Sequence, residues 1–231
     1  MKQWLDAAID RGAVPILTGQ NGDMDTIGSA IALAAIHPSL LACGLHLGRI
    51  AKRLVEEMEA PFRKIAAHGT VFPDQLGGII IVDAAAPTQV GIDLPEVPRL
   101  IIDHHATNGW ELRDGDFMMQ WDVRATTEMV ATYMFQHAKE ALSSPVRKML
   151  LAGMITDTGR YRHANQSSFA ITSKLLEGSD FDYAEFCEYI ERETTSPSER
   201  GSLLRGLGRT KHHDAGDWSL VTTHAGTLEG R

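Results

Sequence analysis

Four apolar segments of this chain lead into aspartates, and this repeated arrangement restricts its fold more than any other feature. Residues 79–82 are aliphatic and run directly into Asp83, and residues 100–102 run into Asp103-His104-His105. Short, continuous aliphatic runs are typical of strands buried on both faces of a parallel sheet. Three consecutive metal-capable side chains are costly to bury unless they are paired. The chain therefore needs a fold that gathers these strand ends in one place.

The other two segments deliver their aspartates through a loop or a turn. Residues 14–17 lead through a loop to Asp23-Met24-Asp25, and residues 150–156 lead to Asp157-Thr158-Gly159. Together the four segments supply five carboxylates and two imidazoles. Ligands collect at the carboxyl ends of strands in open α/β sheets. We therefore expect these groups to form one site.

The apolar runs alternate with helical patterns, which predicts an α/β fold. We expect a doubly wound, mainly parallel sheet with helices on both faces, followed by a helical segment. Strands are expected at 14–18, 40–47, 79–82, 100–102 and 218–223, and helices at 2–12, 27–36, 51–59, 126–139, 145–155, 167–177, 183–192 and 198–208. Residues 1–195 would form the catalytic α/β domain. Residues 196–231 would form a linker helix and the start of a truncated C-terminal domain.

Composition excludes some classes of protein. The net charge of −8 argues against broad binding to nucleic-acid duplexes, which depends on Lys and Arg neutralising phosphates. No apolar stretch approaches the ~18 residues that span a bilayer, and the first residues lack the core of a signal peptide. Cys43 and Cys187 lie far apart in the sequence. We expect two reduced thiols in a cytoplasmic protein.

The donor set favours Mn²⁺ or Mg²⁺, because carboxylates with few imidazoles suit these ions better than structural zinc. Asp23-Met24-Asp25 would place both carboxylates on the same side of an extended segment. Two ions about 3.5–4 Å apart can activate a water and hold a phosphoryl oxygen. Each motif alone has a simpler explanation as a helix cap or a turn. The combination in this order favours the two-metal site.

These residues resemble the DHH phosphoesterase superfamily over roughly residues 10–180. The superfamily includes RecJ-type nucleases, oligoribonuclease and pAp-phosphatase types, cyclic-dinucleotide phosphodiesterases and family II inorganic pyrophosphatases. Residues 23–30, Asp83, Asp103-His104-His105 and residues 157–161 resemble its four motifs. Thr126-Thr127-Glu128 resembles the helix start that follows the third motif in oligoribonuclease-like members.

The resemblance implies two metal ions. One would be held by Asp25, Asp83, His104 and Asp157. Asp23 and the bridging Asp83 would hold the other. The nucleophile would be a water activated by the ions.

The resemblance also implies two catalytic residues and shows two departures from the family pattern. His105 would face the scissile phosphate, and Asp103 would support the cluster. Many members carry a His ligand where this chain has Gly19, so one metal site would be weak, rebuilt by other residues, or occupied only with substrate. The glycine-rich His motif of the usual C-terminal substrate domain does not occur, so we expect a weaker grip on substrate.

Further candidates lie near these motifs. Arg160 and Arg162, with the neighbouring His163, would meet a phosphate, and Ser29 would contact substrate at the helix entry. His46 or His68 could replace the missing ligand. Residues 211–214, Lys-His-His-Asp, are expected in an exposed loop, with a second metal site as the less favoured interpretation.

The sequence thus predicts a Mn²⁺-dependent phosphoesterase or phosphodiesterase, with exonuclease-like members among its relatives. Its substrate would be a small nucleotide or a short single-stranded oligonucleotide. One alternative is a catalytically weakened nucleotide-binding module, or a module whose site is completed by a homodimer partner or another protein. The other alternative is an inorganic pyrophosphatase.

Overall fold

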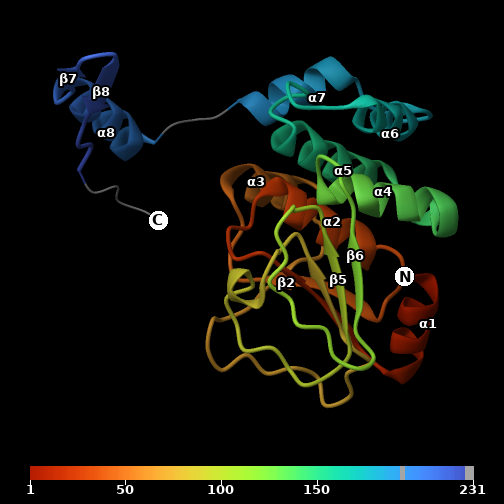
Figure 1. Cartoon of the computed structure of the whole chain (residues 1–231). Helices are drawn as coiled ribbons and strands as arrows, with labels where there is room; N and C mark the ends of the chain where they lie inside the picture. Colours follow the sequence, from red (N-terminus) through yellow and green to blue (C-terminus); the bar gives the residue numbers. More distant parts are fainter. Residues whose placement is uncertain (193–195, 227–231) are drawn as a thin grey trace. The chain divides into compact units, whose positions relative to one another are not determined.

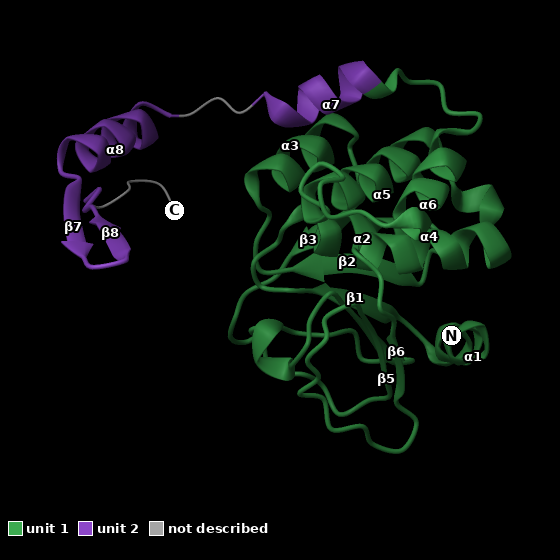
Figure 2. Cartoon of the chain, turned by 45° about the horizontal axis from the view of Figure 1, so that its top comes forward, with its two compact units in different colours: residues 1–183 green, residues 184–231 purple. Residues whose placement is uncertain are grey.

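The computed structural model describes residues 1–192 and 196–226, and the chain divides into two compact units. The first unit comprises residues 1–183 and the second comprises residues 184–231 (Figure 2). The domain boundary predicted at residue 195 lies outside the described residues and stays a prediction.

The first unit contains a six-stranded sheet and most of the helices (Figure 1). Its strands are β1 Val14–Thr18, β2 Leu40–Gly44, β3 Arg63–Lys64, β4 Ile79–Val82, β5 Arg99–Asp103 and β6 Phe117–Gln120. Its helices are α1 Lys2–Arg11, α2 Met24–Ala34, α3 Arg49–Glu57, α4 Thr126–His137, α5 Ser144–Asp157 and α6 Gln166–Leu176, with the short 3₁₀ helices η1 Pro87–Gln89 and η2 Lys139–Ala141. The remaining elements are α7 Tyr183–Glu191, α8 Pro197–Gly208, β7 Lys211–Ala215 and β8 Trp218–Thr222.

All six strands of the large sheet are parallel, in the order β3-β2-β1-β4-β5-β6. The predicted α/β fold with a mainly parallel sheet is confirmed. From β1 the chain proceeds to β2 and β3 on one side, and from β4 it proceeds to β5 and β6 on the other. The adjacent strands β1 and β4 therefore form the topological switch point, where ligands bind in such sheets. Both strands lead into predicted metal ligands.

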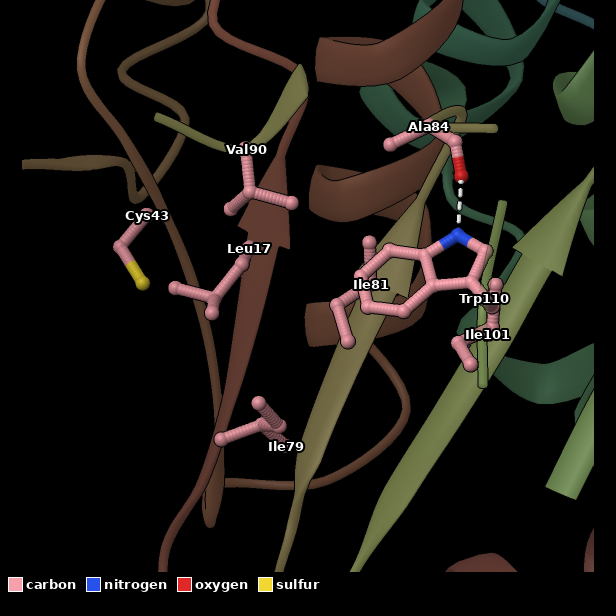
Figure 3. Packing of buried hydrophobic residues seen from close by; sticks show 8 residues of the cluster. All are labelled: Leu17, Cys43, Ile79, Ile81, Ala84, Val90, Ile101 and Trp110. Carbon is pink, nitrogen blue, oxygen red and sulfur yellow. Dashed lines mark hydrogen bonds between the residues drawn. The ribbon is translucent and has the colours of Figure 1, made fainter. Parts of the chain in front are cut away.

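One face of the sheet packs against α2. Residues that pack on the other face, such as Ile65, Phe72 and Leu94, come from segments outside the helices and strands. The second face carries a hydrophobic cluster that includes Leu17, Ile81, Ile101 and Trp110 (Figure 3). The indole Nε1 of Trp110 donates a hydrogen bond of 2.7 Å to the carbonyl of Ala84. This bond satisfies the polar atom of a buried ring and fixes the backbone that follows β4.

Helices α2 and α5 approach each other closely because glycines line their contact. A Cβ at Gly28 would lie 2.6 Å from the carbonyl oxygen of Met149. A Cβ at Gly153 would lie 2.5 Å from Cγ2 of Thr127 in the first turn of α4. These glycines let α5 bring its last residue, Asp157, toward the ends of β1 and β4.

The structure corrects several sequence expectations. Residues 211–214, expected in a loop, form most of strand β7, which pairs antiparallel with β8. Strand β6 was not expected, because it is a half-exposed edge strand without an aliphatic run. Helix α2 begins at Met24 rather than Ile27, so Asp25 lies inside its first turn.

Among the described residues, we find no helix that has both the length and the apolar character required to cross a bilayer.

We expect Gly28→Ala to lower the free energy of unfolding by about 1–3 kcal/mol, because the methyl group forces the α2 and α5 backbones apart. Thermal or urea unfolding of the variant measures this. Gly208→Ala in α8 is the matched control, because its Cβ would meet no atom within 4 Å. Equal unfolding midpoints for the wild type and Gly28→Ala would contradict the close helix contact.

Candidate metal centre

The first two predicted ligands lie at the start of α2 rather than on an extended segment. Asp23 is the N-cap of α2, and its side chain accepts a hydrogen bond of 3.1 Å from the Thr26 amide. Asp25 lies in the first helical turn. The expectation that both side chains share one side of an extended strand is therefore wrong. Helical turns direct the two carboxylates differently.

Asp25 is almost fully buried, with 1% of its surface exposed, and it is held by the N-terminus of α4. The amides of Thr126 and Thr127 donate hydrogen bonds of 2.6 and 2.8 Å to its two oxygens. The Thr127 hydroxyl donates a third bond of 2.6 Å. The first amides of a helix have no partner within the helix, so Asp25 caps α4 while α4 orients Asp25.

Thr26 connects the ends of β1 and β4. Its hydroxyl accepts a hydrogen bond of 2.9 Å from the Gly19 amide and donates one of 3.1 Å to the carbonyl of Val82. The next residue, Asp83, adopts a left-handed conformation with φ of 57°. Aspartate tolerates this conformation better than most residues. The Asp83 carboxylate accepts a bond of 3.2 Å from the Thr126 hydroxyl.

His104 lies among three carboxylates. Its Nε2 atom is 3.5 Å from Oδ1 of Asp83, 3.5 Å from Oδ2 of Asp157 and 3.9 Å from Oδ2 of Asp25. Its other ring nitrogen, Nδ1, lies 3.4 Å from the carbonyl of Val123. These contacts bring together residues from α2, the ends of β4 and β5, and the end of α5.

His105 and the buried Asp103 form a pair beside this group. Nδ1 of His105 lies 2.7 Å from Oδ1 of Asp103, and the same nitrogen is 3.9 Å from Asp83. With Nδ1 engaged by Asp103, the opposite nitrogen Nε2 is the one available to a ligand. The imidazole is 41% exposed, whereas the Asp103 side chain is fully buried.

Burial raises the pKa of three aspartates in the cluster, and repulsion between carboxylates adds to the shift for two of them. Burial raises the pKa of Asp83 well above the ordinary value of 3.8, and repulsion from Asp25 and other carboxylates adds to the shift. Burial also raises the pKa of Asp25, although bonds from Thr127 oppose it. Burial, with repulsion from Asp25, raises the pKa of Asp157 to about 6. Such a cluster is stabilised by a cation.

The donor atoms fit a divalent cation. Two sets of three side chains each place one ligand atom apiece within 4.8 Å of one another: Asp83, His104 and His105, and Asp25, His104 and Asp157. Carboxylate oxygens with imidazole nitrogens are suitable donors for such ions. Asp23 falls outside both sets, although its charge raises the pKa of Asp83 and of Asp157.

Gly19 leaves little room for the ligand that the family pattern often has there. A Cβ at this position would lie 3.0 Å from Oδ1 of Asn21 and 3.1 Å from the carbonyl oxygen of Asp83. Asn21 also donates a hydrogen bond of 2.5 Å to Asp23. Here the chain therefore places an amide beside Asp23 instead of an imidazole.

The remaining candidates differ in their burial. Ser29 is fully buried within α2, and its hydroxyl has no hydrogen-bond partner among the described residues. Arg160 and Arg162 are exposed on the turn after Asp157, as is His163. His46 and His68 are exposed and belong to neither donor set of the described chain. The substrate-binding roles of Ser29, Arg160 and Arg162 stay predictions.

Sequence reasoning missed the structural role of Thr126 and Thr127. It noted their likeness to a family motif but not that they hold Asp25. Thr126 and Thr127 are the first two residues of α4, and the sequence predicts this helix start but not the group that its amides bind. Their partner lies more than a hundred residues away, so no local pattern identifies it.

Comparisons with known proteins give a family and several relatives. A family model described as "DHH family, N-terminal domain" matches residues 13–154. An uncharacterised protein of Methanocaldococcus jannaschii, MJ0988, is 22% identical over 227 residues, which cover 96% of this chain and 67% of that protein.

Two solved structures share the fold. A candidate family II inorganic pyrophosphatase of Methanococcus jannaschii has a TM-score of 0.65 at 20% identity, covering 90% of this chain and 70% of that one. An exopolyphosphatase-related protein from Bacteroides fragilis has a TM-score of 0.61 at 17% identity, covering 91% and 64%. This chain thus spans about two thirds of the length of these relatives.

We expect the metal-free protein to lose stability as pH rises from about 4 through about 6. The raised pKa of Asp157, about 6 against 3.8, means that the folded state binds this proton more tightly than the unfolded state. The stabilisation is complete below the unfolded-state pKa of 3.8 and is lost as the pH rises above the folded-state pKa of about 6. Unfolding midpoints in chelator across this pH range measure it. The same decline in Asp157→Asn would contradict this assignment.

We expect Asp83→Asn to raise the thermal midpoint of the metal-free protein at about pH 7.5, because it removes a repelled carboxylate. The same variant should lose the stabilisation that Mn²⁺ gives the wild type. Scanning calorimetry with chelator and then with Mn²⁺ tests both effects. A lower metal-free midpoint, or a full response to Mn²⁺, would contradict the role of Asp83.

Proposed function

Because this chain belongs to the DHH family, whose N-terminal domain model matches residues 13–154, we propose that it is a metal-dependent phosphohydrolase of small nucleotides or short single-stranded oligonucleotides. The reaction would hydrolyse a phosphodiester or phosphomonoester bond. The observation that carries this proposal is the convergence of Asp25, Asp83 and Asp157 on the imidazole of His104.

The proposed ions are Mn²⁺ or Mg²⁺, held by Asp25, Asp83, His104 and Asp157, with Asp23 near a second position. Bound ions of this kind lower the pKa of water and stabilise negative charge on a phosphoryl group. Asp83 is suited to the shared position, because it approaches His104 and His105 from the end of β4. Since Asn21 beside Gly19 is a weaker donor than an imidazole, we propose that the ion near Asp23 binds less tightly.

His105 is proposed to act on the phosphate, and Asp103 is proposed to position the His105 ring. The 2.7 Å contact between Asp103 and Nδ1 fixes the orientation of the ring. The amide of His105 also donates a bond of 3.3 Å to Asp103. A protonated Nε2 would stabilise charge that develops on the phosphoryl oxygens or supply a proton to the leaving group.

Two other functions remain candidates. The fold likeness to a candidate pyrophosphatase makes pyrophosphate a necessary test substrate. Gly19 stands where many family members have a His ligand for one metal ion. A module that binds nucleotides without hydrolysing them is therefore the second candidate. We further propose a cytoplasmic setting, with a second copy or another protein completing the site.

We expect Asp83→Ala and His104→Ala to lower kcat/KM for pApA with Mn²⁺ by at least about a hundredfold, as the loss of a primary charge-stabilising group does. Asp74→Ala is the matched control, because Asp74 is exposed in a loop outside the cluster. Light scattering of each preparation reports whether a second copy is present.

Three outcomes of this assay would contradict the proposal in different ways. Wild-type turnover by Asp83→Ala would exclude the metal centre as the reacting site. Phosphate release from pyrophosphate without cleavage of pApA would favour the pyrophosphatase. Tight binding of pApA without cleavage, with Mn²⁺ supplied, would favour the binding module.

A further inference from the structure

Two aromatic rings stack on each other in the segment that follows Asp157, the last of the candidate metal ligands. The ring centroids of Tyr161 and Phe169 are 5.4 Å apart, and their planes differ by 22°. Phe169 is 55% exposed, although it is a large apolar side chain. We call these two residues the aromatic pair. A stacked pair with one exposed ring offers a flat apolar face to a ligand.

A tight turn holds Tyr161 close to Asp157, the last residue of α5. The three residues Gly159, Arg160 and Tyr161 all have positive φ, of 58°, 59° and 63°. The amide of Tyr161 donates a hydrogen bond of 2.9 Å to the hydroxyl of Thr158. Because Tyr161 is the fourth residue after Asp157, their Cα atoms lie at most about 15 Å apart.

Helix α6, which carries Phe169, is linked to helix α4. The hydroxyl of Ser168 donates a bond of 3.1 Å to the buried carboxylate of Glu128 in α4. Asn165 caps α6 by accepting a bond of 3.0 Å from the Ser168 amide. Since the first turn of α4 also holds Asp25, one helix positions both the metal ligand and the residue preceding Phe169.

Tyr161 is also held by the helix that carries Phe169. The hydroxyl of Tyr161 lies 2.7 Å from Oγ1 of Thr172, one turn after Phe169 in α6. This contact orients the Tyr161 ring without covering Phe169. Arg160 and Arg162 flank Tyr161 and are exposed. Exposed aromatic rings next to arginines are typical of surfaces that bind single nucleotides and single strands.

We propose that the aromatic pair is the stacking platform for a nucleobase of the substrate, with Phe169 as a specificity-determining residue. The inference rests on the proposed function, because the phosphate of the same nucleotide would lie at the metal centre. Stacking is sequence-tolerant, since every base has a π-face. The platform therefore selects nucleotides over pyrophosphate without selecting one base.

The test compares wild type, Phe169→Ala and Phe169→Trp on pApA and on an analogue that lacks the bases, with Mn²⁺ present. We expect Phe169→Ala to raise KM for pApA by about 5- to 100-fold, as the loss of one stacked base does. Its kcat, and its KM for the abasic analogue, should stay at the wild-type values. Phe169→Trp should restore KM for pApA. Phe117→Ala, which removes an exposed ring at the start of β6, is the matched control.

Calorimetric titration of AMP into the Mn²⁺-loaded proteins separates failure of the platform from failure of the proposed function. If the wild type cleaves pApA and Phe169→Ala has the same KM and AMP affinity, the platform is wrong and the function stands. If the wild type does not cleave but AMP affinity falls in Phe169→Ala and returns in Phe169→Trp, the platform stands and hydrolysis is wrong. If the wild type neither cleaves nor binds AMP, both are overturned. Equal thermal midpoints of the three proteins show that folding is unaffected.

Discussion

The hydrogen bonds from the first turn of α4 to Asp25 are the interaction on which the metal centre depends. A carboxylate with almost no exposure is costly to bury unless donors surround it, and three bonds from Thr126 and Thr127 supply these donors. The same bonds give the N-terminus of α4 its cap. The same bonds thus fix the position of α4 and stabilise the charge of Asp25. If α4 moved away from α2, both the helix end and the buried carboxylate would lose their hydrogen-bond partners.

The topology explains why the other ligands arrive at the same place. Strands β1 and β4 are neighbours at which the chain turns to opposite sides of the sheet, and ligands bind at this point in such sheets. Asp83 follows β4 directly, and the helix start with Asp25 follows β1. Asp157 is brought in by α5, because Gly28 and Gly153 allow a helix contact that larger residues would prevent.

The sequence predicted the central strands and the carboxylates after them because buried parallel strands leave continuous aliphatic runs. It did not predict β6, since Phe117–Gln120 at the sheet edge is half exposed and lacks such a run. It predicted a loop at residues 211–214, whose polar side chains gave no strand pattern, whereas these residues belong to β7 and pair with β8. The bond between Thr127 and Asp25 and the left-handed backbone of Asp83 arise from tertiary contacts, so local patterns did not contain them. Most of the predicted ligands lie close together in the structure. Their roles in binding a metal ion remain predictions.

The raised pKa values in the cluster have a consequence for how the protein would acquire its ions. Where Asp83 and Asp157 hold protons more tightly than free carboxylates do, an incoming cation has to displace those protons. Metal uptake would then release acid, and the apparent affinity would weaken in acidic solution. Protons and divalent cations thus compete for the same carboxylate oxygens. The fraction of the protein that carries metal would depend on both the pH and the free metal concentration.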